Sequence, residues 1–192
     1  MIEIQSIKYT PQSQFHMLRH FESLDDATTQ LMLDNGYTQN QIQQELSLPG
    51  SKFFSHFAND INELLEKVLQ NPYKKSTGIN GNHIIESIFP IEDYPNGIGT
   101  KAVVSIDDIS SAQQTQIFKE KNRNYELAHL LVDTLPVTNQ CTLILKPIPE
   151  GYAFITAFSG ESAMPIPDYK MSKSQFDACK TFWDGHVFLK KI

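Results

Sequence analysis

The stretch Cys141–Gly160, "CTLILKPIPEGYAFITAFSG", decides the fold because it holds two strands joined by a hairpin-length connection. The runs "CTLILKP" and "YAFITAF" are rich in β-branched and aromatic residues, and Gly151 between them can adopt a positive φ angle. Regular alternation predicts that one face of the second strand carries Tyr152, Phe154, Thr156 and Phe158. A threonine among aromatic residues indicates either a hydrogen-bonded core strand or the floor of a substrate groove.

The chain around this hairpin alternates between strand and helix patterns. Residues 83–91 and 100–106 are short β-branched runs, and the turn-rich "EDYPNGIGT" lies between them. Residues 107–135 and 172–185 are predicted helices, the second of which ends at Gly185, and "HVFLKKI" is a last strand. The pattern predicts an α+β fold with a mainly antiparallel sheet of four to five strands, packed with helices.

The N-terminal part of the chain shows helical periodicity over residues 13–70. The polar, glycine-bearing "KKSTGINGN" at 74–82 then predicts a linker, so we expect a helical domain at 1–75 and an α+β domain at 76–192. Residues 36–57 also fit a weak helix-turn-helix pattern. Its second helix would expose Phe53, Phe54 and Phe57, which favours a bundle packed on a core over a DNA-reading helix.

Composition and charge restrict the classes of function. Apolar residues make up 40% of the 192, charged residues make up 20%, and the formal net charge is −6, without the basic excess of most duplex-binding proteins. No apolar run is long enough to span a bilayer, and the first residues lack a signal-peptide pattern, so we expect a cytoplasmic protein without a membrane partner. Cys141 and Cys179 fit no metal-ligand spacing, and neither a metal nor a cofactor is expected.

The six histidines are the main chemical resource of the sequence. His16 and His20 are four residues apart but lack a third ligand, and His56 lies among phenylalanines. His129, in the predicted helix 107–135, would share a stripe with Glu126 and Asp133, whose carboxylates would raise its pKa. It is either a general acid or base or an exposed surface histidine. His186, beside Trp183, is either a stacking or catalytic residue or an interior histidine.

The combination of a helix histidine, a strand ending in Lys-Pro and the piece "FITAFSG" resembles a superfold of bacterial ribonuclease toxins. These are the barnase, EndoU, colicin D and RelE-like (BECR) proteins, and the resemblance covers roughly residues 100–192. It departs from their pattern at Ser159, where a proline is common. The resemblance implies metal-independent RNA cleavage, in which the ribose 2′-OH attacks the adjacent phosphorus and side chains from a sheet and a helix assist.

The resemblance implies a set of site residues in this chain. His129 matches the helix histidine and Thr156 the strand hydroxyl, while Arg123 and Lys146 are candidate phosphate partners by charge and proximity. The expected substrate-binding residues are Tyr152, Ser159 and His186, with Tyr152 available to stack on a base. The expected partners are RNA and an antitoxin or immunity protein. Two alternatives stay open: a catalytically inactive binding module of the same fold, and a DNA-binding regulator acting through the N-terminal helices.

Overall fold

The computed structural model describes residues 2–122 and 125–192, and it divides the chain into two compact units. The first unit comprises Met1–Thr100 and Val137–Glu161, and the second comprises Lys101–Pro136 and Ser162–Ile192. These units do not coincide with the domains expected at 1–75 and 76–192. The expected boundary lies inside strand β3 (Tyr73–Thr77), because the polar run 74–82 forms this strand and a hairpin loop instead of a linker.

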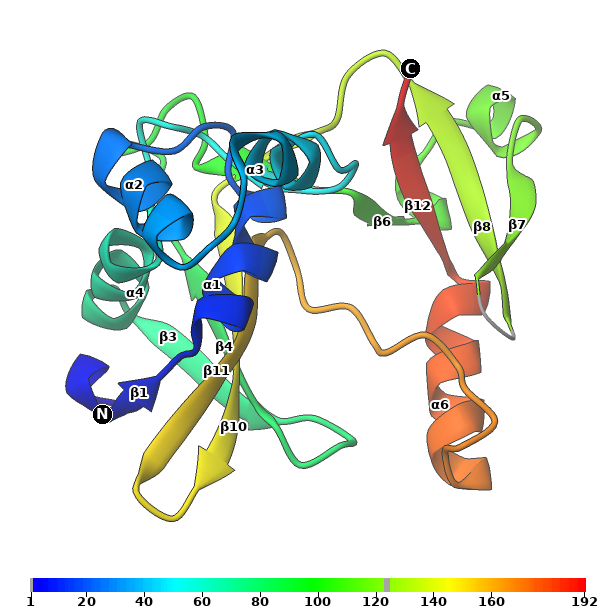
Figure 1. Cartoon of the computed structure of the whole chain (residues 1–192). Coiled ribbons are helices and arrows are strands. Elements are labelled where there is room, and N and C mark those ends of the chain that lie inside the picture. Colours follow the sequence, from blue (N-terminus) through cyan, green and yellow to red (C-terminus); the bar gives the residue numbers. More distant parts are fainter. Residues whose placement is uncertain (1, 123–124) are drawn as a thin grey trace. The chain divides into compact units, whose positions relative to one another are not determined.

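The first unit is built on a five-stranded sheet of order β1-β11-β10-β4-β3 (Figure 1). Its remaining strands are β1 (Ile7–Lys8), β4 (His83–Ile88), β10 (Gln140–Ile148) and β11 (Gly151–Ser159). All neighbours pair antiparallel except β1 and β11. The predicted β10–β11 hairpin is confirmed: Gly151 has a φ of 128°, and a Cβ there would lie 2.3 Å from the Ser6 carbonyl oxygen.

Short helices cover one face of this sheet. They are η1 (Ile4–Ser6), α1 (Pro11–Met17), η2 (Leu18–His20), α2 (Asp26–Asp34), α3 (Gln39–Leu46) and α4 (Ile61–Gln70). Helix α4 buries Leu64, Leu65 and Val68 in one core with Ile85 and Leu143 of the sheet. The residue directly before each of α1 to α4 is a Thr or an Asp whose side chain accepts a backbone N–H of the first turn. This bond satisfies a donor that has no partner within the helix.

A small sheet occupies the place of the second helix in the weak helix-turn-helix pattern, and of the helix expected there in a bundle. Its strands are β2 (Lys52–Phe53), β5 (Gly99–Thr100) and β9 (Val137–Thr138). Phe53 and Phe57 are fully buried, and the Lys52 ammonium donates to the backbone oxygens of Arg19 and Leu46. Phe53 and Phe57 therefore belong to the core, and residues 51–57 present no helix to a DNA groove.

The second unit contains a four-stranded sheet of order β6-β12-β8-β7. Its strands are β6 (Val103–Ser105), β7 (Phe118–Asn122), β8 (Tyr125–Val132) and β12 (His186–Lys191). Its helices are η3 (Ile106–Asp108), α5 (Ser111–Gln114) and α6 (Lys173–Asp184), of which α6 confirms the helix predicted at 172–185. The main buried cluster is small: Val104, Leu130, Val187 and Leu189.

The long helix predicted at 107–135 is wrong, because residues 118–122 and 125–132 of this segment form the antiparallel pair β7–β8. Both faces of β8 are covered: Leu127 and His129 are buried on one face, and Leu130 is buried on the other. A strand buried on both faces has a nearly continuous apolar run, which periodicity alone does not distinguish from a buried helix.

The α+β class with mainly antiparallel sheets is confirmed in the described residues. None of the helices described is long and apolar enough to cross a membrane.

Candidate functional site

One face of the first sheet brings together His83, Lys75 and Tyr152, which we call the His83 cluster. Strand pairing places them there: His83 lies opposite Thr77 on β3 and opposite Leu145 on β10, and Lys75 is two residues from Thr77. Tyr152 is two residues from Phe154, which pairs with Leu145. All three side chains therefore share the face that carries Leu145, and they come from three different strands.

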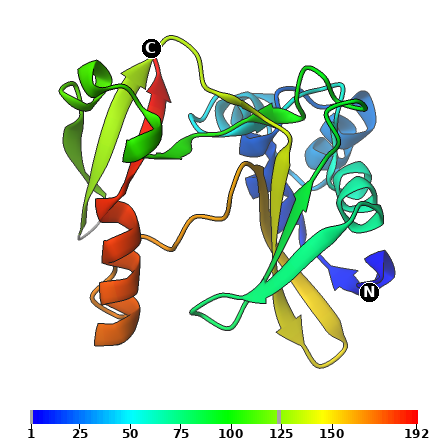
Figure 2. The same ribbon diagram turned by 180° about the vertical axis from the view of Figure 1, so that it is seen from behind.

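The cluster lies where both hairpins turn. His83 is the first residue of β4, directly after the β3–β4 loop, and Tyr152 follows the β10–β11 turn. Figure 2 shows both hairpin ends at the end of the sheet that points away from α2 and α3. Lys75 is exposed, and His83 and Tyr152 are half-buried. The cluster is therefore partly exposed to solvent, although its sheet is otherwise packed against helices on this face.

Tyr152 is the centre of the cluster. The centroids of its ring and the His83 ring are 5.5 Å apart and the rings are tilted by 53°. The Lys75 Nζ lies 5.8 Å from the Tyr152 ring centroid, within the range of a cation–π interaction. An imidazole and an ammonium group thus converge on one aromatic ring.

The surroundings of His83 favour its neutral form. Its Nδ1 is buried and has no hydrogen-bond partner in the described part of the chain, so Nε2 is the ring nitrogen that a ligand can reach. Burial, and then the nearby Lys75 ammonium, lowers the pKa of His83 below its ordinary value of 6.5. At neutral pH this imidazole is therefore uncharged and able to accept a proton, while Lys75 supplies a positive charge beside it.

A β-bulge in β11 places Thr156 on the opposite sheet face from the one that regular alternation predicted. Thr156 pairs with Ile144, but Phe154 pairs with Leu145, so Ile155 is an extra residue in β11. Since Ile144 and Leu145 point to opposite faces, Thr156 does not share a face with Tyr152. The Thr156 hydroxyl is 3.9 Å from the Met17 Sδ, and Lys146, exposed on β10, lies on the same sheet face as Thr156.

His129 lies in the second unit, on strand β8 rather than on a helix. It is buried between Phe118, whose ring centroid is 5.7 Å away, and Phe188 at 5.6 Å. Its Nε2 is 3.8 Å from the Glu120 carboxylate. The expected rise in pKa is wrong: burial, and then Lys190, lowers the pKa of His129 although Glu120 opposes this.

Two further residues of the expected site have structural partners. The His186 ring stacks on Phe182 with centroids 3.8 Å apart, and its Nδ1 is 2.7 Å from the Phe182 carbonyl oxygen. Ser159 is buried in the first unit, where its hydroxyl lies 3.1 Å from the Lys52 carbonyl oxygen and 2.7 Å from that of Thr100. Arg123 lies outside the described residues.

The six described residues of the expected site are thus divided between the units. Four belong to the first unit (Thr156, Lys146, Tyr152 and Ser159), and His129 and His186 belong to the second. His83 was not among the expected residues because "KKSTGINGN" reads as a linker. Had this run been read as a hairpin, its register would have placed His83 beside Lys75.

No group of three or more His, Cys, Asp or Glu side chains that could hold a metal ion occurs among the described residues. Comparison with known proteins adds no assignment: no protein-family model matches the chain, and no curated protein and no solved structure matches it significantly.

Proposed function

We propose that the first unit is a metal-independent endoribonuclease-like domain and that the His83 cluster is its reaction site. One observation carries this proposal: a neutral histidine and an ammonium group converge on Tyr152 at an open end of the sheet. RNA cleavage by its own 2′-OH needs a base for the hydroxyl proton and positive charge for the phosphoryl oxygens. His83 and Lys75 supply these two groups.

The proposed reaction begins when His83 accepts the ribose 2′-OH proton at Nε2, since Nδ1 is buried. The 2′ oxygen forms a bond to the adjacent phosphorus, and the bond from phosphorus to the 5′ oxygen breaks. The leaving oxygen takes a proton from water, and the products are a 2′,3′-cyclic phosphate and a 5′-hydroxyl end. Lys75 stabilises the negative charge that gathers on the phosphoryl oxygens. Tyr152 positions both residues and offers its ring to a base.

This proposal moves the general base from His129 to His83. A general base must come within hydrogen-bond reach of the hydroxyl that it deprotonates. His129 is 6% exposed and lies between two phenylalanine rings, whereas His83 is half-buried beside an exposed lysine.

The test is single-turnover cleavage of an end-labelled, single-stranded RNA of mixed sequence in EDTA. We expect cleavage that leaves cyclic phosphate ends, and none of an otherwise identical strand with 2′-deoxyribose at every position. A folded protein at high concentration that leaves the RNA intact would contradict the proposal. RNA binding without cleavage would instead support the inactive binding module.

A further inference from the structure

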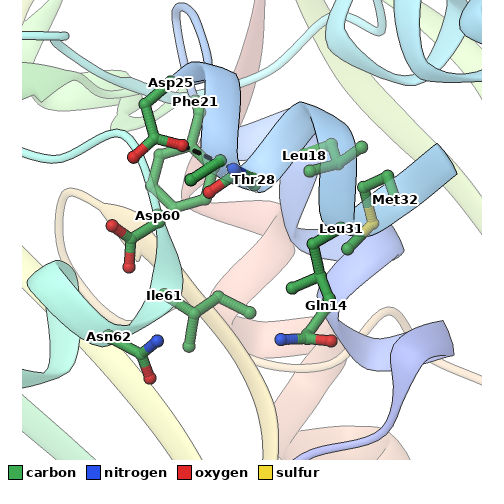
Figure 3. A pocket seen from close by; sticks show the side chains of 11 residues that line it. Gln14, Leu18, Phe21, Asp25, Thr28, Leu31, Met32, Asp60, Ile61 and Asn62 are labelled. Atoms are coloured by element: carbon green, nitrogen blue, oxygen red, sulfur yellow. Dashed lines mark hydrogen bonds between the residues drawn. The ribbon is translucent and has the colours of Figure 1, made fainter. Parts of the chain in front are cut away.

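A pocket in the first unit, separate from the His83 cluster, combines an apolar interior with a negatively charged rim. It lies between α1, α2 and α4 and has a volume of about 180 Å³. Its apolar walls come from Leu18, Phe21, Leu31, Met32 and Ile61. Its polar residues are Gln14, Asp25, Thr28, Asp60 and Asn62 (Figure 3).

The size of the pocket limits what it can hold. Pockets for drug-sized ligands and cofactors have volumes of about 300–1,000 Å³. A volume of about 180 Å³ suits one long side chain instead. The interior also argues against a hard metal cation, because such ions require several oxygen ligands and the walls here are aliphatic and aromatic.

The two carboxylates of the rim are held in place. Asp25 accepts the Thr28 backbone N–H at 2.6 Å at the start of α2, and Asp60 accepts the Glu63 backbone N–H at 3.0 Å at the start of α4. Figure 3 shows Asp25 and Asp60 on the same side of the pocket. None of the described lining residues is a lysine, arginine or histidine, so the lining carries two negative charges and no positive charge.

We propose that this pocket binds a lysine or arginine side chain presented by a partner polypeptide. The stem of such a side chain is aliphatic and its end is cationic, so it can bury the stem against Leu31 and Met32 while the charge meets Asp25 and Asp60. A phosphate-bearing ligand is disfavoured because the rim would repel it. This pocket is therefore a site for protein recognition that does not depend on the proposed RNA cleavage.

The experiment titrates the labelled protein with two peptides and follows the amide NMR signals of Thr28 and Glu63, whose N–H groups bond to the rim. The peptides are Ac-Ala-Lys-Ala-NH2 and its uncharged norleucine counterpart. We expect the lysine peptide to shift both signals and to bind at least about fivefold more tightly, with a difference that shrinks in high salt. Equal binding of the two peptides would overturn the proposal.

The decisive variant is the double substitution Asp25→Asn and Asp60→Asn. Asparagine caps a helix as well as aspartate does, so the charge is removed while the caps remain. We expect at least about tenfold weaker binding of the lysine peptide, and unchanged binding of the norleucine peptide. The matched control is Asp26→Asn, which removes the same charge from the first turn of α2 but does not line the pocket. A control that weakens binding equally would show a general charge effect and contradict the site.

A second variant keeps the test decisive if the double variant does not fold. Leu31 is 43% exposed and lines the pocket, so Leu31→Lys adds a tethered competitor at little cost in packing. It should abolish binding of the lysine peptide, and unchanged binding would contradict the proposal.

Butylammonium chloride tests the source of the cation. If it binds more tightly than the lysine peptide, the pocket takes a free amine and the assignment to a polypeptide fails.

Discussion

His83 in the first unit and His129 in the second are alike in two respects and differ in their access to solvent. Each has a buried Nδ1 without a hydrogen-bond partner in the described residues, and each has a pKa lowered first by burial and then by a lysine. His83 is half-buried at a hairpin end beside exposed Lys75, but His129 is buried between two phenylalanine rings. A lowered pKa alone therefore does not identify a reactive histidine.

The neighbouring charges of the two histidines differ as well. The positive charge beside His129 is already used, because Lys190 pairs with Glu120. Lys75 forms no ion pair with a carboxylate in the described part of the chain, and its Nζ lies 5.8 Å from the centroid of the Tyr152 ring. A cation that is not neutralised by a carboxylate remains available to a phosphate. This difference favours the first histidine over the second as the proposed general base.

The largest expected effect is on RNA cleavage. His83→Gln should lower the single-turnover rate by about 100-fold to 10,000-fold, the usual range for losing a general acid–base group. His129→Gln should leave the rate within about threefold of that of the unmodified protein, provided that the variant is folded under the assay conditions. If His129→Gln is the slower of the two variants, His129 is the better candidate for the base, and the distinction between the two histidines fails.

The second expected effect is on stability, and here the substitution of His129 should cost more than that of His83. His129→Ala should lower the free energy of unfolding by about 2–4 kcal/mol, since it leaves a cavity between Phe118 and Phe188. His83→Ala should cost less than about 1 kcal/mol, because its ring is half-buried. The single tryptophan, Trp183, lies in the second unit and reports its unfolding by fluorescence in urea.

Circular dichroism in the same titration follows both units and provides the control for His83→Ala. If His129→Ala costs as little as His83→Ala, the packing role of His129 is wrong.

The sequence predicted those parts of the fold in which local pattern and tertiary pairing agree. The β10–β11 hairpin follows from two alternating runs around Gly151, and α6 follows from a Ser172 cap and Gly185 after its end. Strand β8 was missed because it is buried on both faces and its run "LAHLLV" lacks alternation.

The candidate site was less predictable than the fold. Lys75 and His83 meet only because β3 and β4 pair in one register, and the polar run between them gave no apolar alternation to indicate a hairpin. The bulge at Ile155 was equally hidden, since it depends on how β11 pairs with β10. The bulge is set by the partner strand, and the β3–β4 hairpin lacks the apolar alternation that would have indicated it, so neither feature was visible in the hydrophobic pattern.

A third prediction uses two adjacent lysines on opposite faces of β3. Lys75→Gln should lower kcat/KM for RNA by about tenfold to a hundredfold, less than for a fully buried donor because solvent screens this exposed group. Lys74→Gln removes the same charge from the neighbouring position, which faces away from His83 and lies opposite Glu86. It should change kcat/KM by less than about threefold. Equal losses would indicate general attraction of RNA by a basic edge strand.

The smallest effect concerns pH, and its sign follows from the lowered pKa of His83. A general base acts when unprotonated, so kcat/KM should be constant above the pKa of His83 and fall as pH drops through it, at a pH below 6.5. In Lys75→Gln the smaller cause of the lowering is gone, so this acidic limb should move toward 6.5, while His129→Gln leaves it in place. Rates measured from pH 4.5 to 8 under single-turnover conditions test this, with circular dichroism at each pH to confirm folding. A limb that stays in place in Lys75→Gln but moves in His129→Gln would mean that the titrating base belongs to the second unit, and the distinction between the two histidines would fail.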